Sequence, residues 1–226
     1  MQVTEQSAAA KTEEVAHTRS AVERWLCWTG LVPLPAFLML HLGRELSLAM
    51  ATDVSEVVRP APSAFGLATA ALLVWAPLAA HAALGVWLLT SRTRSALPAD
   101  VPRRARLASR LCSVVALLFV LYHARQYPLA ALLGEADARD AGFRLISELS
   151  AASWGTPVAG LAYLLGLAAT VAHAGLGVHR GLLSLGLLAG DAQRRASARS
   201  CVVLATLLFC IGAAAVIRVA NGVLLR

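Results

Sequence analysis

Charged residues are scarce in this sequence, and their scarcity limits the class of protein. Asp, Glu, Lys and Arg together make up 15% of the chain, compared with about 25% in an average soluble domain. Hydrophobic residues make up 58%, and the mean hydropathy is +0.66. Several apolar stretches exceed the ~20 residues that a helix needs to cross a bilayer. The composition therefore excludes a sizeable soluble domain and predicts an all-α, polytopic membrane protein.

Cysteine is also scarce, and no cysteine motif is present. The four cysteines lie in or beside apolar stretches, as is typical of small buried hydrophobes; they are Cys27, Cys112, Cys201 and Cys210. No C-x-x-C pair is available for an iron–sulfur cluster or a zinc ion. No G-x-G-x-x-G is available for a dinucleotide. Flavin, nicotinamide and iron–sulfur chemistry would have to come from other proteins.

Five apolar runs predict five transmembrane helices. They form a domain of residues 24–226, which follows a polar tail of residues 1–23 on the cytoplasmic side. The predicted spans cover residues 25–47, 64–90, 107–133, 157–188 and 199–225. Pro33 and Pro35 predict a bend early in the first span, and Pro77 predicts one in the second.

A further helix is predicted in the loop after the third span. Phe143, Ile146 and Leu149 recur there at helical spacing. Such spacing indicates a short amphipathic helix, which we expect to lie on the outer surface of the membrane.

Arginine predicts the orientation in the membrane. Arg-rich connections follow the second and fourth spans, from Arg92 to Arg110 and from Asp191 to Arg199. Loops rich in Lys and Arg stay on the cytoplasmic side. We therefore expect the N-terminus inside and the C-terminus outside.

The most informative local pattern is a repeated segment inside two spans. The segment His81-Ala-Ala-Leu-Gly-Val86 recurs as His173-Ala-Gly-Leu-Gly-Val178. An ionisable residue at that depth costs about 3 kcal/mol and indicates a function. The glycine at i+4 lies on the same helix face and leaves room for a flat, bulky group held by the imidazole. Haem is such a group, although small residues also serve plain helix packing.

Two further histidines complete a pattern of depths. At ~1.5 Å per residue, His81 lies roughly 15 Å from the cytoplasmic end of its span, and His41 and His123 lie roughly 24 Å from theirs. The shared motif assigns His173 to the level of His81. The depths predict two pairs, each from two helices, as in cofactor sites of helical proteins. We therefore expect two haem b groups with His41, His81, His123 and His173 as axial ligands to iron.

Two alternatives remain open at this point. A proton relay also uses intramembrane histidines, but such relays usually recruit Asp or Glu, and no predicted span has a carboxylate near its centre. His179, which lies six residues after His173 on another face, is an alternative ligand. No C-x-x-C-H is present, so any haem would be held without covalent attachment.

These features resemble the cytochrome b membrane-anchor subunit of succinate:quinone oxidoreductases, of the single-subunit, two-haem kind found in bacterial succinate dehydrogenases and fumarate reductases. The resemblance covers nearly the whole chain and is carried by five spans and by one histidine in each of the first four. It implies that the first and third histidines hold the outer haem and that the second and fourth hold the inner one. It also implies a location in the bacterial cytoplasmic membrane.

The resemblance further implies partners and a substrate. A flavoprotein with FAD and an iron–sulfur protein would dock on the cytoplasmic face, and this chain would carry electrons between the iron–sulfur centre and a membrane quinone. On its own, it would not catalyse the dicarboxylate step.

The resemblance also directs attention to polar residues near the histidines. Arg44 and Arg125 are candidates for pairing with haem propionates, although they also suit interfacial anchors. Glu45, Tyr122 and Gln126, together with Arg125, are candidates for a quinone site near the outer haem, although headgroup contacts explain them equally well. The family's Glu beside the fourth histidine is absent here, so a proton path through it is not expected.

Two other functions remain possible from the sequence. One is the cytochrome b of another membrane oxidoreductase, such as a hydrogenase or a formate dehydrogenase. The other is a non-redox membrane transporter whose histidines face a water-filled path.

Overall fold

Helices make up all the regular structure that the computed structural model of this chain describes, which covers residues 21–50, 63–90, 103–130, 133, 141–151 and 158–221. No strand occurs in these residues. Five helices are long and apolar enough to cross a membrane: Ala21–Ser47, Ala68–Thr90, Arg106–Tyr127, Val158–Ser184 and Asp191–Ala220. The prediction of an all-α, multi-pass membrane protein is thereby confirmed. Residues 1–20 of the predicted tail lie outside the described residues.

The elements follow one another along the chain with few irregular segments. A helix of residues 21–31 precedes the labelled elements, which are α2 (Pro33–Met50), α3 (Ala64–Ala70), η2 (Ala71–Trp75), α4 (Ala76–Thr90), α5 (Arg103–Ala124), η3 (Arg125–Leu129), α7 (Ala141–Ser150), α8 (Val158–Ser184) and α9 (Asp191–Ala220). The elements η2 and η3 are single π-helical turns within the second and third spans.

Proline explains the irregularities in the first two spans. The first span is interrupted at Val32, directly before Pro33, as predicted. In the second span, the π-helical turn η2 ends two residues before Pro77, and the N–H of Ala76 bonds to the carbonyl of Ala71. Proline lacks an N–H and clashes with the preceding turn of a helix, and a wider π turn relieves such a clash.

Two helix boundaries differ from the prediction. The last helix begins at Asp191 rather than near Arg199, because Gln193 accepts hydrogen bonds from the N–H groups of Ala189 and Gly190 and so caps the helix. Arginines in its first turns keep their charged ends in water while the helix continues into the bilayer. The fourth helix ends at Ser184 rather than near Leu188, because Gly186 adopts a left-handed conformation with a φ of 71°.

Helices α2, α5, α8 and α9 pack closely. Leu42 of α2 meets Leu167 and Val171 of α8 and Leu208 of α9 in one buried cluster. Glycines permit the close approach, because a Cβ at Gly166 would overlap the ring of Phe119. Small residues at helix contacts are typical of membrane proteins.

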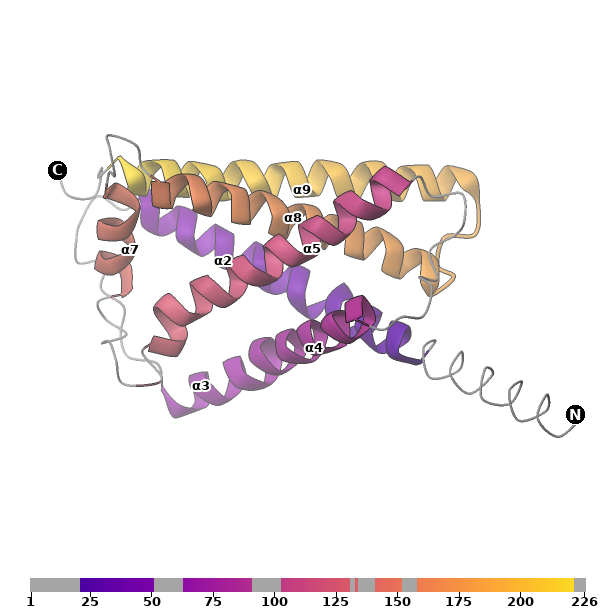
Figure 1. Cartoon of the computed structure of the whole chain (residues 1–226), viewed down its shortest axis with the longest axis horizontal. Coiled ribbons are helices and arrows are strands. Elements are labelled where there is room, and N and C mark those ends of the chain that lie inside the picture. The colour runs from indigo at the N-terminus through magenta and orange to yellow at the C-terminus, as the bar shows by residue number, and fades with distance from the viewer. Residues whose placement is uncertain are drawn as a thin grey trace, which may run out of the picture.

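The predicted amphipathic helix is present as α7. Ile146 and Leu149 are 3% and 1% exposed and pack against Tyr163, Ala215 and Val219 from α8 and α9. Figure 1 shows α7 lying across the ends of α8 and α9, near the C-terminus. The N-terminus lies at the opposite end of the molecule, together with the starts of α5 and α9.

The second span stands apart from the others. None of the residues from Ala71 to Thr90 is buried, and Figure 1 shows α3 and α4 along the side away from α8 and α9. Close side-chain contacts nevertheless join this span to its neighbours at His81.

Candidate functional site

Four histidines from four spans meet in two pairs. His81 of α4 and His173 of α8 have ring centroids 5.9 Å apart, with an angle of 71° between the ring planes. His41 of α2 and His123 of α5 have ring centroids 5.8 Å apart, with an angle of 65°. The pairing expected from the depths is the pairing that the structure contains.

The two pairs lie at two levels. On α5, Ser113 contacts His173 and lies ten residues before His123. On α8, Tyr163 contacts His123 and lies ten residues before His173. At the rise of an α-helix, both intervals place the levels roughly 15 Å apart. The pair of His81 and His173 lies toward the end of the molecule that carries the N-terminus (Figure 1), and we call it the inner pair. His41 and His123 form the outer pair.

Hydrogen bonds fix the tautomer of both histidines in the inner pair. Nδ1 of His81 lies 3.2 Å from the carbonyl oxygen of Leu26, which only accepts, so this nitrogen carries the proton. Nδ1 of His173 lies 3.0 Å from Oγ of Ser113, whose own hydroxyl donates to the carbonyl of Ser109. Since a neutral imidazole has one proton, Nε2 of each ring carries the lone pair that binds a metal.

The outer pair has a similar arrangement around His123. Its Nδ1 lies 3.4 Å from the hydroxyl oxygen of Tyr163, and that hydroxyl donates to Tyr127 at 3.3 Å. Tyr163 therefore accepts the proton of His123 Nδ1. On the other side of the pair, Nδ1 of His41 lies 3.8 Å from Oε1 of Glu45, and its ring stacks on Phe37.

Glycine shapes the surroundings of the inner pair in two ways. A Cβ at Gly30 would lie 2.5 Å from Cε1 of His81, so only glycine lets the first span approach that ring. A Cβ at Gly85 or at Gly177 would have no heavy atom within 4 Å. The space expected beside the glycine of each repeated segment is therefore open.

His179 does not join either pair. Its Nδ1 lies 3.1 Å from Oγ of Ser197, which links α8 to α9. The ring beside His81 is that of His173, so the geometry favours His173 over His179 as the fourth member of the set.

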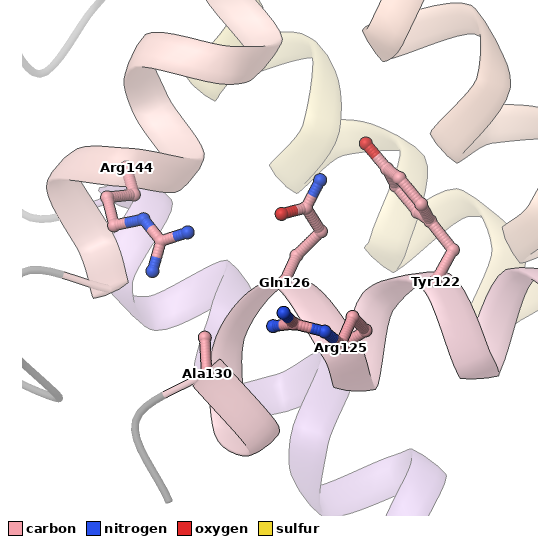
Figure 2. A pocket seen from close by; sticks show the side chains of 5 residues that line it. All are labelled: Tyr122, Arg125, Gln126, Ala130 and Arg144. Carbon is pink, nitrogen blue, oxygen red and sulfur yellow. The ribbon is translucent and has the colours of Figure 1, made fainter. Parts of the chain in front are cut away.

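The candidate quinone residues separate into two groups. Tyr122, Arg125 and Gln126 line a pocket of about 410 Å³ near the outer pair, together with Ala130 and Arg144. Figure 2 shows the side chains of Arg125, Gln126 and Arg144 pointing into the same space. Glu45 is not among the lining residues and lies beside His41 instead.

The candidates for propionate contacts lie one turn or less from the outer histidines. Arg44 is exposed on α2, three residues after His41, and Arg125 is exposed on η3, two residues after His123. Both therefore lie at the level of the outer pair.

Sequence reasoning missed several residues at these sites. Arg144 and Glu148 come from α7, where Glu148 accepts hydrogen bonds from the hydroxyls of Tyr122 and Tyr127. Ser113 and Tyr163 were also missed, because a single Ser or Tyr in an apolar span has no spacing that marks it as a partner of a distant histidine.

Among the described residues, no three His, Cys, Asp or Glu side chains come together as a site for a metal ion. The comparisons with known proteins identify no relative: no protein-family model matches the chain, and no curated protein or solved structure proved similar to it.

Proposed function

We propose that this chain is a membrane-anchor cytochrome b that holds two haem b groups and carries electrons between an iron–sulfur partner and a membrane quinone. Its place would be in a bacterial succinate dehydrogenase or fumarate reductase. The observation that supports the proposal best is the meeting of four histidines from four spans in two pairs, with ring centroids 5.8 and 5.9 Å apart.

The pairs fit haem better than a bare metal ion. Two imidazoles that bind one metal from opposite sides place their ring centres about 6 Å apart, since each metal–nitrogen bond is about 2 Å. Two protein ligands are too few for a typical zinc site, but they suffice for haem, because its porphyrin supplies the other four nitrogens. A bundle of five spans around two such groups also accounts for the second span, which contributes His81 yet has no buried residue between Ala71 and Thr90.

The chain's own residues would orient the ligands and tune them. Haem iron with two histidine ligands supplies one-electron transfer without binding a substrate. Leu26 and Ser113 hold the inner imidazoles with the proton on Nδ1. Such partners fix the orientation of the ring and raise its basicity as a ligand. Tyr163 does the same for His123 in the outer pair.

The pocket beside the outer pair suits the quinone. Two guanidinium groups, an amide and a phenol converge on it from α5, η3 and α7 (Figure 2). These groups donate hydrogen bonds, which the carbonyl oxygens of a quinone accept. Its position near His123 would let electrons pass between the quinone and the outer haem.

The opposite end of the molecule suits the cytoplasmic partners. Arginines gather there on the first turns of α5 and α9 and near the end of α8 (Figure 1); they are Arg103, Arg104, Arg106, Arg110, Arg180, Arg194, Arg195 and Arg199. The preference of arginine for the cytoplasmic side favours an inner location for this end. The iron–sulfur and FAD-containing subunits would then dock next to the inner pair.

The spectrum of the purified protein tests the proposal. We expect a reduced-minus-oxidised spectrum of b-type haem with about two haems per chain, by analogy with two bis-histidine sites. The variant His179→Ala is the matched control, because His179 bonds to Ser197 outside both pairs. A colourless wild-type protein would contradict the proposal and would favour a transporter.

The partners distinguish this function from that of another cytochrome b. We expect a flavoprotein and an iron–sulfur protein to co-purify with the chain, and succinate to reduce its haems. Co-purification with a hydrogenase or a formate dehydrogenase would contradict the assignment to succinate and fumarate while leaving the haem sites in place.

A further inference from the structure

A chain of three hydrogen bonds links the outer histidine pair to the surface helix α7. It runs from Nδ1 of His123 to the hydroxyl of Tyr163, from there to the hydroxyl of Tyr127, and on to Oε2 of Glu148. The four residues come from α5, α8, η3 and α7, so the contact joins four elements that are distant in sequence.

All donors in this chain point in one direction. Tyr127 donates to the Glu148 carboxylate and Tyr163 donates to Tyr127. Tyr163 must therefore accept from His123, whose proton lies on Nδ1. Hydrogen bonds that follow one another in this way polarise and strengthen each other, so the charge at Glu148 acts on the imidazole through the two phenols.

The inner pair has no such connection to a carboxylate in the described residues. The Nδ1 proton of His173 is accepted by Ser113, whose hydroxyl donates to the carbonyl of Ser109, while Arg180 donates to Oγ of Ser109 at 2.7 Å. The Nδ1 proton of His81 is accepted by the carbonyl of Leu26. The carboxylate-terminated relay is thus a property of the outer pair.

We propose that Glu148 is a positioning residue for the outer pair, which holds the imidazole of His123 through Tyr127 and Tyr163 and lowers the reduction potential of the haem bound there. The proposal rests on the function proposed above. Its physical basis is that a carboxylate behind an axial histidine makes that ligand more basic and that nearby negative charge stabilises the oxidised iron.

A redox titration of the purified two-haem complex, followed by its visible spectrum, tests the role of Glu148. In Glu148→Gln, we expect the midpoint of one haem to rise by about 59 mV, a tenfold change in a one-electron equilibrium. The other haem should keep its midpoint. The haem that shifts should be the one that His123→Ala removes. The control is Ser147→Ala, an exposed neighbour on α7 whose side chain lies outside the relay.

A second variant separates the relay from a direct effect of the charge. Tyr163→Phe removes the hydroxyl next to His123 without changing the shape of the core. We expect it to raise the same midpoint, and we expect Glu148→Gln to add little in the Tyr163→Phe background, because both changes break one path. Rescue of the midpoint by Glu148→Asp would further support a role of the carboxylate.

Three outcomes would overturn the inference. They are an unchanged midpoint in Glu148→Gln, equal shifts of both haems, and additive shifts in the double variant. If Glu148→Gln loses haem altogether, the midpoint of Tyr163→Phe decides the question in the same way. A wild-type protein without haem would instead refute the proposed function, so the two failures are distinguishable.

Discussion

Gly30 lies so close to His81 that a Cβ at this position would come within 2.5 Å of Cε1 and within 2.8 Å of Nδ1. The ring of His81 is held from the same side by the carbonyl of Leu26 and by Oγ1 of Thr29, at 3.2 and 3.4 Å. The first span thus supports an imidazole that belongs to the second, and it does so with its backbone.

Replacing Gly30 should therefore displace one ligand and spare the other pair. For Gly30→Ala, we expect about half of the haem to be lost, together with about 1–3 kcal/mol of stability, since an added methyl group forces its neighbours to move. The haem-to-protein ratio and the unfolding midpoint measure both effects. Gly43→Ala in the same span is the control, because a Cβ there would meet nothing within 4 Å. Equal haem content in the two variants would contradict the role of Gly30.

The pairing itself makes a prediction about which haem each histidine holds. His81→Ala and His173→Ala should remove the same haem, because their rings form one pair. His41→Ala and His123→Ala should both remove the other haem. Absorption and electron paramagnetic resonance spectra of the four variants distinguish the two haems. Loss of different haems in the two variants of one pair would refute the pairing.

The sequence was sufficient to predict the spans and the histidine pairs for a simple physical reason. A transmembrane helix rises by ~1.5 Å per residue, so position along the span is depth in the membrane. Histidines at equal depth on different spans have few ways to avoid one another. The surface helix α7 was predictable on similar grounds, because Ile146 and Leu149 lie on one face of it.

The hydrogen-bonding partners of the histidines were not predictable in this way. Ser113 lies 60 residues from His173, and Tyr163 lies 40 residues from His123. Which residues meet across such intervals depends on the rotation of each helix about its axis, and hydropathy does not specify it in spans that are apolar all round. The early start of α9 was missed for another reason: arginines at a helix end extend toward water without ending the helix.

Ser113 gives the most direct test of how the inner pair is held. In Ser113→Ala, the Nδ1 proton of His173 loses its acceptor. Loss of such a partner typically lowers affinity at a metal site by about 10–100-fold. We expect faster transfer of one haem to an excess of a soluble haem-binding protein. Thr206→Ala is the control, since its hydroxyl bonds only to Val202 of the same helix turn. Equal rates of transfer in both variants would show that Ser113 does not support the ligand.

Arg144 tests the pocket beside the outer pair and the contribution of α7 to it. Its side chain lines the pocket with Arg125 and Gln126 (Figure 2). A hydrogen bond from a charged donor is worth about 1.5–3 kcal/mol, so Arg144→Ala should raise the KM for quinol by roughly 10-fold or more. Because the contact is to the bound quinone and not to the haem, both haem midpoints should stay unchanged. Arg110→Ala, an exposed arginine near the start of α5 at the other end of the molecule, is the control. A KM that rises equally in both variants would mean that arginines act on quinol through general surface charge, whereas a KM that rises only in Arg144→Ala would locate quinol binding in this pocket.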